Sequence, residues 1–136
     1  MPIITGSCLC GAIHYASSAQ PALTAFCHCR SCQKAGGFVF VSGQVARAEN
    51  GDVIAGGIEA HTRQTMKNVA HALALAGCTL EDVVKTTVWL DDARDFDEFN
   101  RVYGEFFLRN KPARSTTQAK NMVDTKIEIE VIAYKP

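Results

Sequence analysis

No charge of one sign dominates this chain, because 14 lysines and arginines balance 14 aspartates and glutamates. A nucleic-acid surface needs a basic excess, so we expect no nucleic-acid partner. No run approaches the roughly 18 apolar residues that a membrane span needs, so we expect no membrane partner. The first residues also lack the basic and apolar regions of a signal peptide, so we expect a cytoplasmic protein.

Cysteine is scarce in most of the chain: Cys78 stands alone, whereas the other five lie between residues 8 and 32. Their spacing is C-x-C followed by C-x-C-x-x-C, and thiolates grouped in this way are typical zinc ligands. The alternative is that free thiols only fill small apolar sites. The candidate zinc ligands are Cys27, Cys29 and Cys32, with a fourth from Cys8, Cys10, His14 or His28.

Residues 6–37 resemble the start of the glutathione-dependent formaldehyde-activating enzyme family, through the words GSCLCGA and CHCRSCQ. In that family the first cysteine pair joins a later C-x-x-C pair at a structural zinc, and the second group supplies three ligands to another zinc. The later pair is absent from this chain. The resemblance therefore implies at most one zinc ion, and a zinc-thiolate module acting on a glutathione adduct is one candidate function.

The remainder of the chain predicts an α+β fold. Residues 38–41 form a continuous apolar run, which predicts a strand buried on both faces. Apolar periodicity predicts helices over 58–76 and 96–107, and β-rich or alternating segments predict three more strands. These strands span residues 83–90, 114–120 and 126–134. We expect a mixed sheet with two helices packed on one face.

We expect residues 1–36 to form a cysteine-rich segment that supplies N-terminal strands, and residues 37–136 to complete one compact domain. Gly77 predicts the end of the first helix. Thr79 and Asp82 have the spacing of a capping box. Two histidines on the first helix, His61 and His71, are expected to be exposed rather than ligands.

Two residues of the C-terminal fifth suit a small anion. Arg114 follows Pro112, and a guanidinium is a planar fork that matches a carboxylate. In residues 126–133, Glu128 lies on the opposite strand face from the isoleucines, where a carboxylate can hold or activate water. We interpret Arg114 and Glu128 as members of one site. The alternative is a surface arginine and a solvated sheet face.

Residues 34–136 resemble the reactive intermediate deaminase (RidA) family, which also carries the older names endoribonuclease L-PSP and translation inhibitor. The matching words occur in family order. They are FVSGQ (40–44), GGIEAHTRQ (56–64), DVVKTTV (82–88), DFDEFNRVY (95–103), PARST (112–116) and IEIEVIA (127–133).

The resemblance implies a chorismate-mutase-like fold and a homotrimer with clefts between subunits. It implies hydrolysis of 2-imino acids, released by amino-acid dehydratases, to 2-oxo acids and ammonia, without a metal or organic cofactor. Arg114 would clamp the substrate carboxylate, Glu128 would orient or activate water, and Ser42 and Gly43 would line the pocket. A trimer that binds 2-oxo acids with little or no turnover is the alternative.

One departure from the RidA pattern concerns the N-terminus. The family begins with a GPYSQ-type segment whose tyrosine lines the cleft, and this chain lacks it. We therefore interpret the chain as a chimera with its crossover near residue 34. Either residues 30–35 or residues 12–17 are expected to pair with the strand at 38–41, because that strand would otherwise have an open edge.

Overall fold

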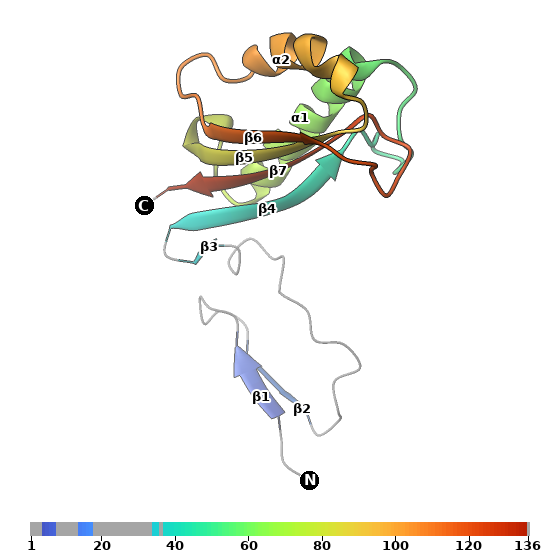
Figure 1. The fold of residues 1–136 in the computed structure, drawn as a ribbon. Coiled ribbons are helices and arrows are strands. Elements are labelled where there is room, and N and C mark those ends of the chain that lie inside the picture. Colours follow the sequence, from blue (N-terminus) through green and yellow to red (C-terminus); the bar gives the residue numbers. More distant parts are fainter. Residues whose placement is uncertain (1–3, 8–13, 18–33, 36, 136) are drawn as a thin grey trace.

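The computed structural model describes residues 4–7, 14–17, 34–35 and 37–135, with side chains from Gly37 to Lys135 (Figure 1). Two 3-10 turns, Leu80–Asp82 and Ala93–Asp95, precede β5 and α2. The helices and strands, in chain order, are β1 Ile4–Ser7, β2 His14–Ser17, β3 Lys34–Ala35, β4 Phe38–Val45, α1 Ile58–Leu75, β5 Val83–Leu90, α2 Phe96–Gly104, β6 Ala113–Gln118 and β7 Ile127–Tyr134.

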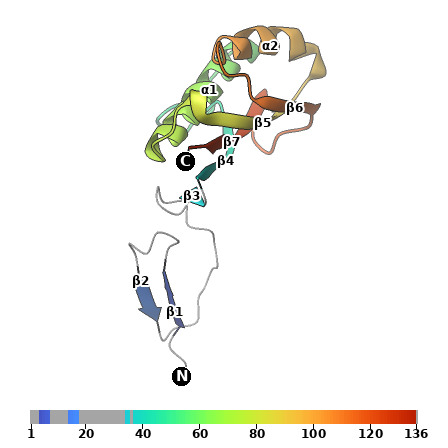
Figure 2. The ribbon, with the colours of Figure 1, turned by 90° about the vertical axis from the view of Figure 1, so that its left-hand side faces the viewer.

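The main sheet has the strand order β3-β4-β7-β5-β6. β7 is antiparallel to both β4 and β5, whereas β6 is parallel to β5. α1 therefore connects β4 to a parallel strand, and α2 does the same for β5 and β6. Both helices lie on the same side of the sheet, as the rotated view shows (Figure 2). The predicted α+β fold is confirmed, with a mixed sheet and two helices on one face.

The hydrophobic core lies between this sheet and α1. Apolar residues alternate along β7, so that Ile127, Ile129 and Val131 all face the helix. Met66, Val69 and Leu73 of α1 are fully buried against them. Burial of a side chain of this size stabilises the fold by about 1.5–3 kcal/mol. The predicted helical stripe and strand alternation are thus confirmed.

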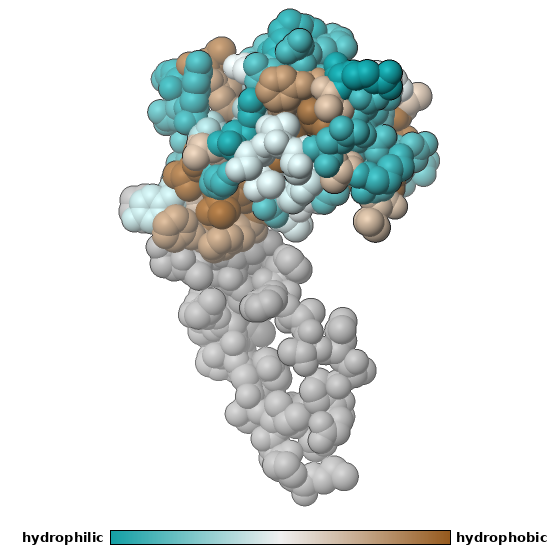
Figure 3. Space-filling view, viewed as in Figure 1, coloured by the Kyte–Doolittle hydropathy of each residue, from teal (hydrophilic) through white to brown (hydrophobic). Residues whose placement is uncertain are grey.

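The expectation that residues 38–41 are buried on both faces is wrong. Val39 and Val41 are buried, but Phe38 and Phe40 are 41% and 56% exposed. The helices cover one face of β4, and the alternate side chains emerge on the other face. Figure 3 shows hydrophobic residues gathered where β4 and the end of β7 lie. Phe38 packs there on Tyr134, with ring centroids 4.8 Å apart.

The expectation that His61 is exposed is also wrong, because its side chain is only 4% exposed. Its Nδ1 accepts a hydrogen bond from the backbone N–H of Lys126 at 3.1 Å and lies 3.3 Å from the hydroxyl of Thr125. His61 thereby joins the start of α1 to the residue before β7. His71, by contrast, is exposed as predicted.

Two predictions about the ends of helices, at Gly77 and at the Thr79–Asp82 capping box, are confirmed. Gly77 follows α1 with a φ of 74°, a left-handed conformation that favours glycine. Thr79 and Asp82 form the predicted capping box. The second helix is shorter than predicted, ending at Gly104, because glycine is a poor helix former.

The prediction that an N-terminal segment pairs with the edge of β4 is confirmed in part. Lys34 and Ala35 of β3 pair with Val39 and Phe38. β2 pairs instead with β1, in a two-stranded antiparallel sheet. Among the helices that the structure describes, none has the length and apolar character needed to cross a membrane.

His61 makes the stability of the fold sensitive to acid. Burial is the main reason that the pKa of His61 lies below its ordinary value of 6.5. The unfolded chain therefore binds the proton more readily than the folded chain. We expect the free energy of unfolding to fall as the pH drops below about 6.5, because protonation also removes the acceptor used by Lys126.

Denaturation with urea at several pH values tests this expectation. His61→Asn, which retains an acceptor near the Nδ1 position, should flatten the pH dependence between pH 8 and pH 5. His71→Asn removes an exposed histidine from the same helix and serves as the control. An equally steep pH dependence in the His61 variant would contradict the assignment.

Candidate functional site

Arg114 lies on the edge strand β6 and faces α2. Its register partner on β5 is Thr86, which is fully buried on the helix side of the sheet. Thr86 in turn shares a hydrogen bond of 2.8 Å with the hydroxyl of Tyr103 on α2. The strand register therefore fixes which face of the sheet carries the guanidinium.

Three aromatic rings of α2 surround this guanidinium. Its central carbon lies 4.8 Å from the ring centroid of Tyr103, 5.3 Å from that of Phe99 and 5.9 Å from that of Phe96. Cation–π contacts of this kind contribute about 0.5–2 kcal/mol. Burial raises the pKa of Tyr103, while its hydrogen bond with Thr86 and the charge of Arg114 act in the opposite direction. The phenol thus stays neutral beside the cation at neutral pH.

Asn100 on α2 accepts a hydrogen bond of 2.8 Å from Nη2 of Arg114. Among the described residues no carboxylate pairs with this arginine. The described arginines at positions 63, 94, 101 and 109 each lie within 4 Å of an aspartate or glutamate oxygen, and Arg47 donates instead to the backbone oxygen of Gly51. Arg114 therefore presents a positive charge that lacks a counter-ion in the described part of the chain.

Arg114 lines a hollow of about 360 Å³ between α2 and β6. The hollow can hold a small molecule of a few carbon atoms. None of its lining side chains is acidic. They are Asn100, Tyr103, Gly104, Phe107, Lys111, Pro112 and Arg114.

Glu128 lies elsewhere, on the uncovered face of the sheet beside β4. Its neighbours Ile127 and Ile129 are buried under α1, so the strand alternation turns Glu128 to the opposite face. The β4–β7 register shifts between Val41 and Gln44, and the irregularity contains Ser42 and Gly43. A Cβ on Gly43 would lie only 1.9 Å from Oε1 of Glu128. The absence of a side chain at Gly43 thus makes room for the carboxylate.

The structure brings some predicted site residues together and separates others. Glu128 and Gly43 are in close contact, with Ser42 beside them on β4. Arg114 lies on the helix side of the sheet, two strands away across β5. One small molecule therefore cannot contact both Arg114 and Glu128 of the same chain.

Asn100, Tyr103 and Lys111 were missed as site residues from the sequence. A signal for the α2 residues was available, because Asn100, Tyr103, Gly104 and Phe107 follow the i, i+3, i+4, i+7 spacing of one helix face. Lys111 lies in the turn before β6, where hydrophobic periodicity does not indicate which way a side chain points.

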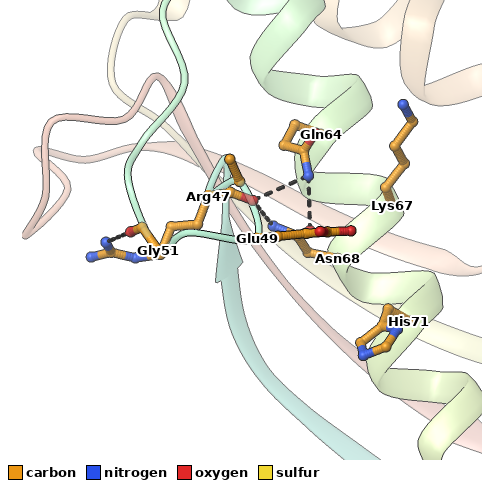
Figure 4. Close-up of a pocket in the computed structure, with 8 residues that line it drawn as sticks. Arg47, Glu49, Gly51, Gln64, Lys67, Asn68 and His71 are labelled. Carbon is orange, nitrogen blue, oxygen red and sulfur yellow. Dashed lines mark hydrogen bonds between the residues drawn. The ribbon is translucent and has the colours of Figure 1, made fainter.

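A second hollow, of about 730 Å³, lies between α1 and the loop after β4 (Figure 4). The amides of Gln64 and Asn68 both donate to the backbone oxygen of Arg47, at 3.1 and 2.9 Å. The guanidinium of Arg47 turns to the backbone oxygen of Gly51, away from Lys67 and His71. The polar groups here fasten a loop to a helix, and the charged side chains do not converge.

Within the described residues, no three histidine, cysteine, aspartate or glutamate side chains lie close enough to hold a metal ion. Cys78 is a buried free thiol. The side chains of the candidate zinc ligands lie outside the described residues, so zinc binding stays a prediction. Those residues are Cys8, Cys10, His14, Cys27, His28, Cys29 and Cys32.

Known proteins resemble this chain in sequence and in fold. The family described as Endoribonuclease L-PSP matches residues 18–135. A RutC family protein of Pyrococcus horikoshii is 43% identical over 104 residues, which are 75% of this chain and 82% of that protein. Human 2-iminobutanoate/2-iminopropanoate deaminase is 37% identical over 99 residues, 71% of this chain and 72% of the human protein.

Among solved structures, E. coli TdcF with bound serine has a TM-score of 0.71 and 33% identity, covering 76% of this chain and 84% of TdcF. The family match begins 16 residues before the predicted crossover at residue 34. The resemblance of residues 6–37 to formaldehyde-activating enzymes, and with it the chimera, stays a prediction.

The contact between Gly43 and Glu128 can be tested by Gly43→Ala. We expect the new methyl group to drive the carboxylate of Glu128 off its position, visible in a crystal structure of the variant. The free energy of unfolding should change by no more than about 1.5 kcal/mol, because a long side chain can shift its rotamer at small cost. Gly57→Ala is the control, since no atom lies within 4 Å of its added Cβ. An unmoved Glu128 would contradict this geometry.

Proposed function

The chain belongs to the endoribonuclease L-PSP family, the RidA family that its motifs resemble, and from this premise we propose that it hydrolyses short 2-imino acids to 2-oxo acids and ammonia. The observation that carries the proposal is Arg114. It is an arginine without a carboxylate partner among the described residues, held on aromatic rings at a hollow of small-molecule size. Such a group favours an anionic ligand.

Arg114 is proposed to bind the carboxylate of the imino acid. Its Nη2 already donates to Asn100, which leaves the remaining donors for a substrate. Stacking on Tyr103 and Phe99 limits the movement of the guanidinium and so reduces the entropy lost on binding. Charge-assisted hydrogen bonds of this kind contribute about 1.5–3 kcal/mol.

Glu128 is proposed to act on water. The water oxygen adds to the imine carbon and the imine nitrogen gains a proton. The carbon–nitrogen bond then breaks, so one water and one imino acid give one 2-oxo acid and one ammonia. A carboxylate can accept the proton of the attacking water and return it to the leaving nitrogen. The space at Gly43 lets this carboxylate lie close to the backbone of β4.

A complete site is proposed to need two copies of the chain. Arg114 and Glu128 lie on opposite faces of one sheet, so both can reach one substrate only if they come from different subunits. The exposed aromatic residues Phe38, Phe40 and Tyr134 on the uncovered face suit burial against another subunit. A homotrimer with clefts between its subunits meets this requirement by cyclic symmetry.

Two other functions receive less support. The serine bound to TdcF suits a trimer that holds small amino, imino or oxo acids without turnover, and the assay below separates this alternative. The ribonuclease of the family description would need acid–base groups beside a phosphate. Of the histidines whose side chains are described, His61 is buried with its Nδ1 engaged, and His71 lies away on α1.

A coupled assay tests the reaction. A threonine dehydratase generates 2-iminobutanoate in the presence of semicarbazide, which traps the imine, and the rate of 2-oxobutanoate formation is followed. We expect the protein to accelerate that rate, and Arg114→Ala to reduce the acceleration roughly 10- to 150-fold. Arg94→Ala removes an arginine that pairs with Asp92 in the turn before α2 and should have no effect.

Full activity in Arg114→Ala would refute the assigned site. Absence of acceleration by the parent protein, together with 2-oxobutanoate binding by calorimetry, would instead favour the alternative of a binding trimer.

A site shared by two subunits predicts that two impaired variants restore activity when they are combined in one oligomer. Arg114→Ala and Glu128→Gln should each retain only a small fraction of the parent activity when alone. When they are unfolded together and refolded as an equimolar mixture, about a quarter of the sites of a cyclic trimer should combine an intact arginine with an intact glutamate. Activity should return to that level in the mixture, and not when the two variants are refolded separately and then assayed together at once. No recovery from correctly sized mixed oligomers would contradict a shared site.

A further inference from the structure

A second positive charge lies in the hollow that holds Arg114. Lys111 lines it from the turn between α2 and β6, three residues before Arg114. Lys111 is exposed, and among the described residues it has no ion pair with a carboxylate. Lys120 and Lys135 each lie within 4 Å of an aspartate oxygen, whereas Lys67, Lys85 and Lys126 resemble Lys111 in having no such ion pair among the described residues. The hollow thus has two cations and, among its lining residues, no acid.

Two cations that line one hollow suit a ligand with a negative charge at each end. The flexible four-carbon stem of a lysine lets its ammonium adjust its position toward such a ligand. Pro112 fixes the backbone between them by limiting its own φ. Arg114 is held by Asn100 and three rings, so the flexible partner is Lys111.

The rest of the hollow is suited to the carbon chain of such a ligand. Tyr103 and Phe107 supply apolar surface, and Gly104 adds no side chain. The volume of about 360 Å³ exceeds what a three- or four-carbon monocarboxylate occupies. A longer ligand can therefore lie with one carboxylate at Arg114 and a second at Lys111.

We infer that Lys111 determines specificity for dicarboxylic substrates: imines of four- and five-carbon amino acids that carry a side-chain carboxylate. This inference rests on the proposed deaminase function. Arg114 takes the carboxylate next to the imine carbon, as for any 2-imino acid. Lys111 takes the distal carboxylate, which monocarboxylic imines lack. Lys111 therefore acts on the choice of substrate and not on the chemical step.

The test compares two imines in the semicarbazide assay. Threonine dehydratase supplies 2-iminobutanoate, and an aspartate oxidase supplies the dicarboxylic imine of aspartate. The measured quantity is the ratio of the two accelerations, dicarboxylic over monocarboxylic. We expect Lys111→Met to lower it about fivefold, the size of a solvent-exposed ion pair, and Lys111→Glu to lower it about 25-fold because repulsion replaces attraction.

Lys67→Met is the matched control, since it removes the same charge from an exposed lysine of α1, at the other hollow. Its ratio should equal that of the parent protein. Activity on 2-iminobutanoate should fall much less in Lys111→Met than in Arg114→Ala. An unchanged ratio in both Lys111 variants would overturn the role of Lys111 while leaving the proposed function intact.

A binding measurement keeps the two proposals separable. Calorimetry gives the affinities of the parent protein and Lys111→Met for 2-oxoglutarate and for 2-oxobutanoate. A loss confined to 2-oxoglutarate supports the inference, even if no imine is hydrolysed and the proposed function fails. Equal losses for both ligands, equal affinities in the two proteins, or no binding of 2-oxoglutarate to the parent protein would overturn it.

Discussion

The central strand β7 imposes the constraint on which the rest of the arrangement depends. It pairs with β4 on one side and β5 on the other, and its side chains alternate between the core and the uncovered face. Ile127, Ile129 and Val131 cannot leave the core, so the glutamate between the first two is held on the other face. A shift of one residue would exchange the two sets. Hydrophobic burial thus positions a charged group that contributes nothing to the core.

Much of the fold could be predicted because its signals are local. Helical periodicity predicted a helix over residues 58–76, one residue longer than α1, and the β-rich segment at residues 83–90 coincides with β5. A glycine after α1 and a capping box before β5 mark ends of elements through contacts over a few residues. Such features require no knowledge of the tertiary structure.

The errors concern contacts between segments far apart in the chain. His61 bonds Lys126, which is 65 residues away, and this contact cannot be predicted from a helical pattern. The exposure of Phe40 depends on which sheet face the helices leave uncovered. Arg114 and Glu128 were interpreted as members of one site, but they lie on opposite faces of the sheet, as the registers of β5 with β6 and β7 require. Asn100 reaches Arg114 only because α2 packs beside β6.

The bond from His61 to Lys126 has a consequence for enzymology. Lys126 comes immediately before β7, and Glu128 is two residues further along, so a buried imidazole anchors the strand that carries the carboxylate. For the proposed hydrolysis, a profile of rate against pH would then also depend on the protonation of His61, a buried group that lies apart from Arg114 and Glu128. An inflection caused by His61 would report the attachment of a strand and not an acid or a base that acts on the proposed substrate.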